Sequence, residues 1–301
     1  MERRWRPDRP LDLRATLRPL RHGPMDPAWR HTADGAFWRT CATPDGPGTL
    51  RVAMTVGGTA GCVVGAAWGP GAGWLLETLP ALLGEDDDAS GLTPEHEVVR
   101  RAAKRHEGLR IGRTFRVFES LVPAVLEQKV VSEEGWRAWR WLLDRYGESA
   151  PGPAPEGMRV FPGPEVWRSI PSWDWHRAGA EAVRARTIVN AARHAAKLEA
   201  AGDSAATDLL LRALPGVGAW TSAEVRQRSH GDADALSVGD YHLSSLVGWA
   251  LIGQRTDDAG MLRLLAPYLG HRHRVSRLLR LAGERPPARG PRARARDYRS
   301  F

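Results

Sequence analysis

The sequence has 301 residues, enough for about two domains. Its apolar content of 42% is ordinary for a globular protein, and no apolar run reaches the roughly 18 residues of a membrane-spanning helix. The net charge of +8 favours a polyanionic partner such as nucleic acid, while the two cysteines, Cys41 and Cys62, exclude a disulfide framework and a cysteine-bound metal site.

The N-terminal residues and the cysteines also predict where the protein works. Basic residues at the N-terminus have no apolar segment behind them, so we expect no secretory signal. Two unpaired cysteines suit a reducing compartment. We therefore expect a cytoplasmic protein without a membrane partner.

Residues 1–91 predict a small α+β lobe with an antiparallel sheet. Apolar residues alternate with polar ones between Leu11 and Leu17, which is the period of a half-buried strand. Three further segments are short, rich in valine, threonine and aromatic residues, and separated by glycine and proline. These predicted strands cover residues 37–42, 49–56 and 61–68.

The end of this lobe predicts one helix and a linker. Residues 74–83 have the apolar spacing of a single amphipathic helix. The acidic, turn-forming run 85–91 then indicates a linker to the next domain.

Residues 92–283 predict a mostly α domain. Thr93 can cap a helix that begins at Pro94, since proline suits the first helical position. A proline-rich stretch at 151–164 predicts a long loop, and there is no internal repeat. The other predicted helices cover residues 115–131, 133–146, 181–200, 206–213, 219–228, 240–251, 257–268 and 273–282.

The last residues, 284–301, form a basic tail. Between Arg285 and Phe301 there are six arginines and one aspartate. Such a block is either a disordered end that keeps the protein soluble or an arm that follows the DNA backbone. The residues alone favour neither.

The segment Leu214-Pro215-Gly216-Val217-Gly218 predicts a tight turn between two helices. Its glycines permit positive φ and a close backbone approach. The helix that begins at Ala219 presents free N–H groups and the positive end of its dipole, which together bind phosphate. An ordinary turn between two helices is the alternative.

The same segment resembles the hairpin of the helix-hairpin-helix DNA glycosylases. The second element of that superfamily, Val238-Gly239-Asp240-Tyr241-His242-Leu243, follows it, with Asp240 placed 22 residues after Gly218. Residues 118–147 resemble the first core helix pair. The strand-containing lobe resembles one subgroup, 3-methyladenine DNA glycosylase II, so that the resemblance spans about residues 10–283.

The resemblance implies a reaction and a catalytic residue. The substrate would be double-stranded DNA with a damaged base, and no obligate protein partner is implied. Asp240 would stabilise the oxocarbenium-like sugar as the base leaves, giving an abasic site for base excision repair. The alternative for Asp240 is a helix N-cap, because aspartate is a preferred cap residue, and the two roles can coexist.

Two features of relatives are missing from the sequence. Relatives that also cut the backbone carry a lysine nucleophile on the second hairpin helix. Trp220 occupies that position here, and no lysine follows Lys197, which implies a monofunctional enzyme. The iron–sulfur cluster of some relatives needs four cysteines, so we expect none.

The resemblance also implies a pocket for the flipped base. Alkylated purines carry positive charge, which aromatic faces attract. Trp220 matches one pocket wall and Tyr268 more loosely a second, and the alternative for each is a core aromatic. Glu224 replaces a further aromatic and either favours a cationic base or faces solvent. Tyr241 and His242 are the nearest donors for a neutral base.

Other functions stay open at this point. The substrate would be an alkylated base such as 3-methyladenine, or hypoxanthine, uracil or an oxidised purine. A non-catalytic protein that uses the hairpin to clamp DNA is a third possibility. A carboxylate at Asp240 argues against that reading, because pure DNA binding has no use for a negative charge facing DNA.

The predicted DNA contacts surround the hairpin. The residue that fills the gap left by the flipped base should follow Gln128, and it is Lys129, which can instead contact a phosphate or stay solvated. A structural Na⁺ or K⁺ would bind the main-chain carbonyls of Arg212, Leu214 and Val217, as implied by the resemblance. The predicted DNA-binding residues are Gln128, Lys129, Pro215, Gly216, Val217, Gly218, Ala219 and Thr221.

Overall fold

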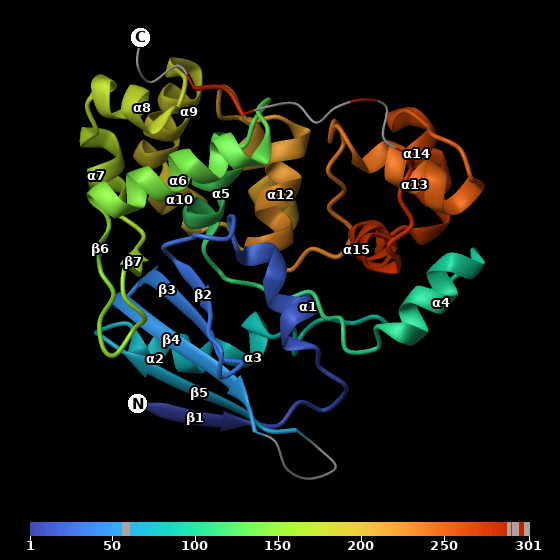
Figure 1. Ribbon diagram of the computed structural model, residues 1–301, viewed down its shortest axis with the longest axis horizontal. Helices are drawn as coiled ribbons and strands as arrows, with labels where there is room; N and C mark the ends of the chain where they lie inside the picture. Colours follow the sequence, from blue (N-terminus) through green and yellow to red (C-terminus); the bar gives the residue numbers. More distant parts are fainter. Residues whose placement is uncertain (56–60, 288–289, 291–294, 298–301) are drawn as a thin grey trace.

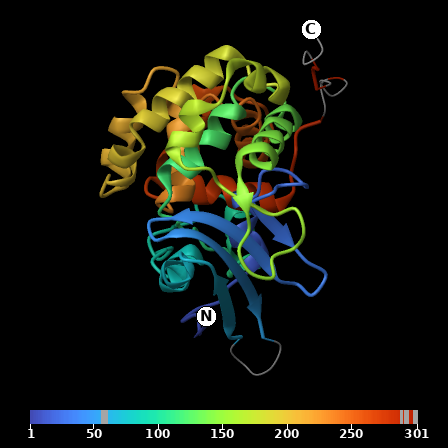
Figure 2. The same cartoon turned by 90° about the vertical axis from the view of Figure 1, so that its left-hand side faces the viewer.

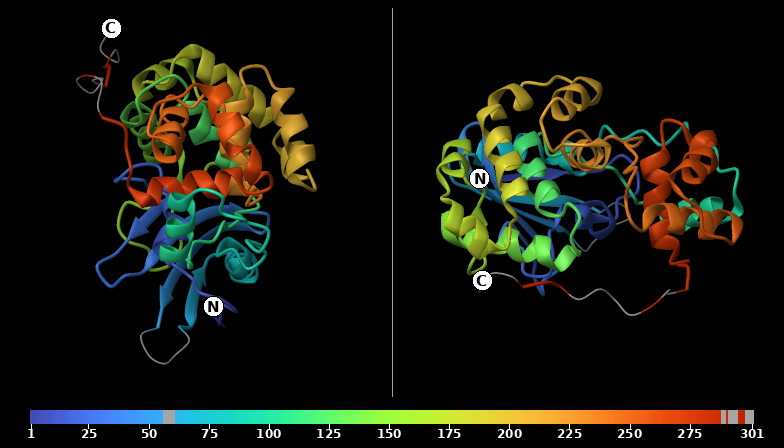
Figure 3. Two further views of the ribbon diagram at one scale, coloured as in Figure 1. Left: turned by 90° about the vertical axis from the view of Figure 1, so that its right-hand side faces the viewer. Right: turned by 90° about the horizontal axis from the view of Figure 1, so that it is seen from above.

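A computed structural model describes residues 1–55, 61–287, 290 and 295–297. It places two groups of helices above a five-stranded sheet (Figures 1 and 2). Seen from above, the two helical groups lie beside each other (Figure 3). The predicted α+β class is therefore confirmed. No helix within these described ranges is long and apolar enough to cross a membrane.

The sheet is antiparallel, with strand order β1-β5-β4-β3-β2. Alternate residues of a strand face opposite sides, and Gly65 faces two short helices that cover the sheet. A Cβ at Gly65 would lie 2.5 Å from the Leu79 side chain, so glycine permits this close packing. The strands are β1 (Glu2–Trp5), β2 (Trp29–His31), β3 (Phe37–Thr43), β4 (Gly46–Met54) and β5 (Val63–Trp68).

The segment from Leu11 to Leu17 is not a strand, contrary to the prediction. It forms helix α1 (Leu13–Leu17), followed by the 3-10 helix η1 (Arg18–Leu20). The Asp12 side chain caps α1 by accepting a hydrogen bond from the Ala15 amide at 2.9 Å. Leu13 and Leu17 are four residues apart, so a helix buries both on one side as well as a strand would.

The single helix predicted over 74–83 is also wrong. Helix α2 (Ala72–Glu77) ends at Thr78, and helix α3 (Leu79–Leu82) begins with Pro80 in its first turn. Proline has no amide hydrogen to continue the bonding of α2. The acidic run that follows is mostly exposed, but Asp87 within it is buried and accepts from Ile111 N at 3.0 Å and from Arg274 Nη1 at 2.9 Å.

The first helical group packs around α5, whose residues are mostly buried. The predicted helix over 115–131 is too long at both ends, because Phe115 and Lys129 have positive φ angles of 55° and 54°. The proline-rich loop is confirmed, apart from a short pair of strands, β6 (Glu148–Ser149) and β7 (Arg159–Val160). The helices are α5 (Val117–Leu126), α6 (Ser132–Tyr146), α7 (Pro164–Ser169), α8 (Ser172–Ala178), α9 (Ala182–Arg193), α10 (Ala195–Glu199), α11 (Ser204–Arg212) and α12 (Ala219–Ser229).

The second helical group has a hydrophobic cluster of its own. Its first helix begins at Glu97 and not at Pro94, since the amide of His96 is held outside the helix by the Tyr268 hydroxyl at 3.0 Å. The segment predicted as a helix from Asp240 begins at Leu243. The elements are α4 (Glu97–Arg105), α13 (Leu243–Ile252), α14 (Asp258–Leu265), the 3-10 helix η2 (Ala266–Tyr268) and α15 (Arg272–Ala282).

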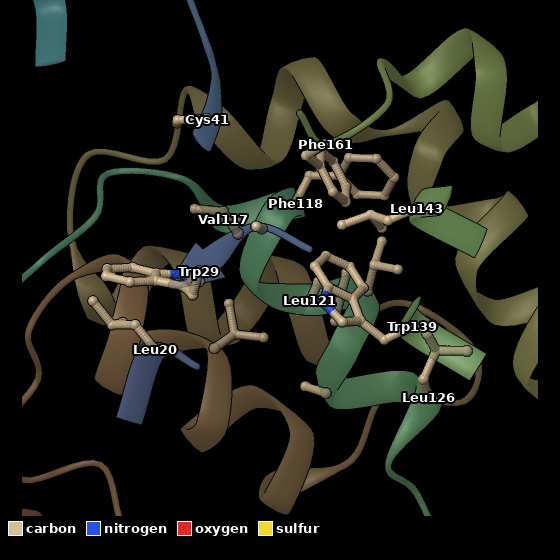
Figure 4. Packing of buried hydrophobic residues seen from close by; sticks show 14 of the residues in the cluster. Leu20, Trp29, Cys41, Val117, Phe118, Leu121, Leu126, Trp139, Leu143 and Phe161 are labelled. Atoms are coloured by element: carbon tan, nitrogen blue, oxygen red, sulfur yellow. The ribbon is translucent and has the colours of Figure 1, made fainter. Parts of the chain in front are cut away.

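One hydrophobic cluster joins the sheet lobe to the first helical group. Trp29 and Cys41 of the sheet pack with Phe118 and Trp139 of α5 and α6 in the same cluster (Figure 4). The core is therefore continuous across the boundary expected near residue 91. Of the basic tail, residues 288–289, 291–294 and 298–301 lie outside the described residues; Arg296 N donates to Glu134 Oε1 of α6 at 2.9 Å.

Candidate active site

The predicted hairpin joins α11 to α12 at the middle of the molecule (Figure 1). Gly216 has a φ of 88°, and a Cβ there would lie 2.2 Å from Thr187 Oγ1 of α9. This position therefore requires glycine for both its conformation and its space. A Cβ on Gly218 would meet nothing within 4 Å, so the start of α12 faces open space.

Residues of the hairpin divide into exposed and buried positions. Pro215, Gly216, Gly218 and Ala219 are exposed at the turn and the first turn of α12. Val217 is buried and fixes the turn through its amide, which donates to Leu214 O at 3.0 Å. The exposed amides at a helix N-terminus are the arrangement that binds a phosphate.

Gln128 holds the hairpin in place. Its side-chain amide donates to Gly216 O at 2.9 Å and to Thr221 Oγ1 at 2.8 Å. Thr221 is 2% exposed, so its side chain supports the hairpin from inside, and its predicted contact with DNA stays a prediction. Lys129 follows Gln128, is exposed and projects from a left-handed backbone.

Asp240 lies on the connection between α12 and α13, at the junction of the two helical groups. One carboxylate oxygen, Oδ1, accepts from His242 N at 2.9 Å and from Leu243 N at 2.8 Å. These bonds tie the carboxylate to the start of α13, as the alternative of a cap predicted. The second oxygen, Oδ2, accepts from Trp220 Nε1 at 3.4 Å.

The fold thus brings Trp220 and Asp240 together, although 20 residues separate them. Both side chains are partly exposed, beside the exposed amides of the hairpin. A partly exposed indole next to a carboxylate whose orientation is fixed by main-chain amides forms a site that can hold a planar base close to a negative charge.

Glu224 neither faces solvent nor carries an unbalanced charge. Its carboxylate accepts from Arg228 Nη1 at 2.8 Å and from Ser237 Oγ at 2.5 Å. Gln227 donates to the same Ser237 hydroxyl at 2.9 Å and to Ala235 O at 2.7 Å. This network fixes the segment before Asp240. It was not predicted, although the polar residues spaced three and four apart on α12 could have indicated it.

Neither Tyr268 nor Tyr241 is hydrogen-bonded to Trp220 or Asp240, although Tyr241 directly follows Asp240 in the chain. Tyr268 is 1% exposed in the core of the second helical group, and its hydroxyl contacts His96 Nδ1 at 2.7 Å. Tyr268 thus faces no open pocket in this structure, and its role as a second pocket wall stays a prediction. Tyr241 is 89% exposed and packs edge-on against His242, so it lines no pocket in this structure.

The predicted monovalent cation site lies at the end of α11. Leu214 O accepts one hydrogen bond from Val217 N, which leaves its second lone pair free for a cation. Carbonyl oxygens at a helix C-terminus also attract positive charge. Leu214 O can therefore also accept a cation, and the full site of Arg212, Leu214 and Val217 carbonyls stays a prediction. Over the described ranges, no three His, Cys, Asp or Glu side chains cluster as metal ligands.

Comparisons with known proteins give matches of structure. No protein-family model matches the sequence, and no curated protein matches it. The 3-methyladenine DNA glycosylase from Archaeoglobus fulgidus has a TM-score of 0.74 and 15% identity, over 93% of this chain and 98% of that one. MBOgg1 in complex with a low-affinity DNA ligand has a TM-score of 0.72 and 16% identity, over 94% and 95%. The 8-oxoguanine glycosylase/lyase from Clostridium acetobutylicum has a TM-score of 0.69 and 12% identity, over 92% and 95%.

Proposed function

We propose that this chain, which has the fold of the helix-hairpin-helix DNA glycosylases, is itself a DNA glycosylase acting on double-stranded DNA. One observation carries the proposal. The Asp240 carboxylate is held by two main-chain amides, points its second oxygen at Trp220 and lies beside a hairpin with exposed amides. A non-catalytic clamp could use Oδ1 as a helix cap but would have no use for Oδ2 facing Trp220.

The geometry supports a sequence of steps. The amides at Gly218 and Ala219 bind a DNA phosphate and fix the position of the strand without reading its sequence. The damaged nucleotide leaves the stack and its base lies against Trp220. As the bond from C1′ to the base breaks, Asp240 stabilises the positive charge on the sugar, and water then adds at C1′.

We further propose that the enzyme is monofunctional. A lyase of this fold would need an amine at the site to form a Schiff base with C1′. The three lysines of the chain are Lys104, Lys129 and Lys197, and none is on α12. Borohydride should therefore trap no covalent complex with DNA under conditions where free base is released. A trapped complex would contradict this part of the proposal.

The class of damaged base depends on the pocket lining. A pocket with aromatic walls would favour an alkylated, cationic base, because aromatic faces attract positive charge. Trp220 supports that class, but Tyr268 is in the core, and the Glu224 charge is offset by Arg228. A base with carbonyl oxygens is the second class, and the guanidinium groups behind Trp220 favour it, as argued below.

The test compares Asp240→Asn with Asp257→Asn. Both aspartates accept amide hydrogen bonds at a helix start, Asp257 from Gly260 N at 2.8 Å, and asparagine is also a good cap. Free bases released from damaged duplexes are identified by mass, and DNA binding is followed by anisotropy. We expect Asp240→Asn to bind DNA but release no base, and Asp257→Asn to stay active. If Asp240→Asn loses binding as well, its role is structural.

A further inference from the structure

A small polar cavity lies where α12, α15 and η1 meet. Pro19, Leu20 and Ile111 are its apolar lining residues, and Thr16 is one of its polar ones. Four further polar side chains also line it, and we call these four the cationic chamber: Gln227, Arg228, His273 and Arg277. Its size suits a single exocyclic oxygen better than a whole base.

Gln227 and Arg228 of the chamber lie at the C-terminal end of α12, whose N-terminal end carries Trp220. Trp220, Glu224 and Arg228 follow at intervals of four residues and so share one face of α12. Arg228 follows Trp220 by eight residues, about 12 Å along the helix, and its guanidinium reaches back toward Trp220 to contact Glu224 Oε2 at 2.8 Å. Glu224 in turn binds Ser237, three residues before Asp240.

The chamber contains two arginines, of which only Arg228 forms an ion pair with a described residue. The Arg228 charge is offset by Glu224. Arg277 makes no ion pair with any described residue, and its side chain donates only to Ala15 O. Burial and neighbouring arginines lower its pKa to about 10, which leaves it charged at neutral pH. Arg277 is half-buried, and the Asp87 carboxylate offsets only part of its charge, so a ligand that accepts hydrogen bonds would stabilise it.

His273 completes the set of donors. It is 8% exposed, and its ring makes no hydrogen bond within the part of the chain that the structure describes. Burial and the surrounding arginines hold the pKa of His273 well below its usual value, so the ring is neutral at pH 7. A neutral imidazole has one N–H donor and one acceptor nitrogen.

We infer that the cationic chamber receives the carbonyl-bearing edge of the extruded base, and that the substrates are neutral or anionic bases with exocyclic oxygens, as in oxidised or deaminated purines. This inference rests on the proposed glycosylase function. Guanidinium N–H groups are the common donors to such oxygens. A positively charged alkylated base would be repelled by Arg277, which selects against that class.

The test measures discrimination in the Asp240→Asn background, where binding is read without cleavage. Anisotropy compares duplexes that contain 8-oxoguanine, hypoxanthine or uracil with duplexes that contain 7-methylguanine or no lesion. We expect at least one carbonyl lesion to bind about tenfold more tightly than undamaged DNA, and Arg277→Gln to remove that preference. Arg280→Gln, on the exposed side of the same helix, is the matched control and should keep it.

Three outcomes would overturn the inference. They are a preference for the methylated duplex, no preference at all, or an equal loss of binding to every duplex in Arg277→Gln. If Arg277→Gln does not fold, Arg277→Lys keeps the charge but not the planar donor group, and it should reduce the preference. Failure of the proposed glycosylase function gives a different result, namely no base release by the wild-type protein. The binding preferences measured here test the role of the chamber independently of that result.

Discussion

Replacing Gly216 with alanine tests whether the hairpin needs its tight contact with α9. The backbone at Gly216 has a φ of 88°, which costs an L-residue about 1–2 kcal/mol. The new Cβ would also lie 2.2 Å from Thr187 Oγ1, and such overpacking costs about 1–3 kcal/mol more. We therefore expect Gly216→Ala to lower the free energy of unfolding by about 2–5 kcal/mol.

Gly270→Ala is the matched control. Its φ is 89°, but its Cβ would meet nothing within 4 Å, so only the backbone strain of about 1–2 kcal/mol applies. Adding Thr187→Ala to Gly216→Ala removes the clashing oxygen and should recover part of the stability. Urea unfolding measures all four proteins, and anisotropy measures their DNA affinity.

Gly216→Ala should also weaken DNA binding, because the clash with Thr187 displaces the hairpin amides that bind the phosphate. One lost hydrogen bond to a charged phosphate weakens binding by about 10-fold or more. We expect this loss in Gly216→Ala and not in Gly270→Ala. The reasoning is refuted if both alanine variants are destabilised equally, or if Thr187→Ala gives no recovery.

Three further predictions concern the residues around the site. Gln128→Ala leaves the buried Thr221 hydroxyl without its partner and should cost about 1–3 kcal/mol in urea unfolding, whereas the exposed Gln254→Ala should cost nothing measurable. Trp220→Phe keeps the aromatic face but removes the donor to Asp240 Oδ2, so single-turnover base release should slow by up to about tenfold; an unchanged rate would exclude a role for this bond. Folding lowers the pKa of His273, so its neutral ring contributes fully to the free energy of unfolding above about pH 6.5. Below that pH the contribution falls by about 1.4 kcal/mol per pH unit. His273→Gln should reduce this pH dependence, measured from urea midpoints at pH 7.0 and 5.5.

The sequence by itself determined the parts of this protein that depend on local rules. Glycine and proline in residues 214–218 can form only a tight turn, and apolar spacing located most helices of the larger region. Asp240 was identified differently, from the resemblance of its segment and of the hairpin to the helix-hairpin-helix glycosylases. Where local patterns are ambiguous, prediction failed: Leu13 and Leu17 suit a strand or a helix equally.

Only the tertiary structure decided which side chains meet. Tyr268 and Trp220 are both aromatic residues on helical segments, yet Tyr268 is buried in the core and Trp220 faces Asp240. Likewise, no sequence pattern connects Arg228, His273 and Arg277, which come from two helices packed against the sheet lobe. Such contacts depend on long-range packing, because burial and charge neighbours are set by elements far apart in the chain and not by the residues beside them.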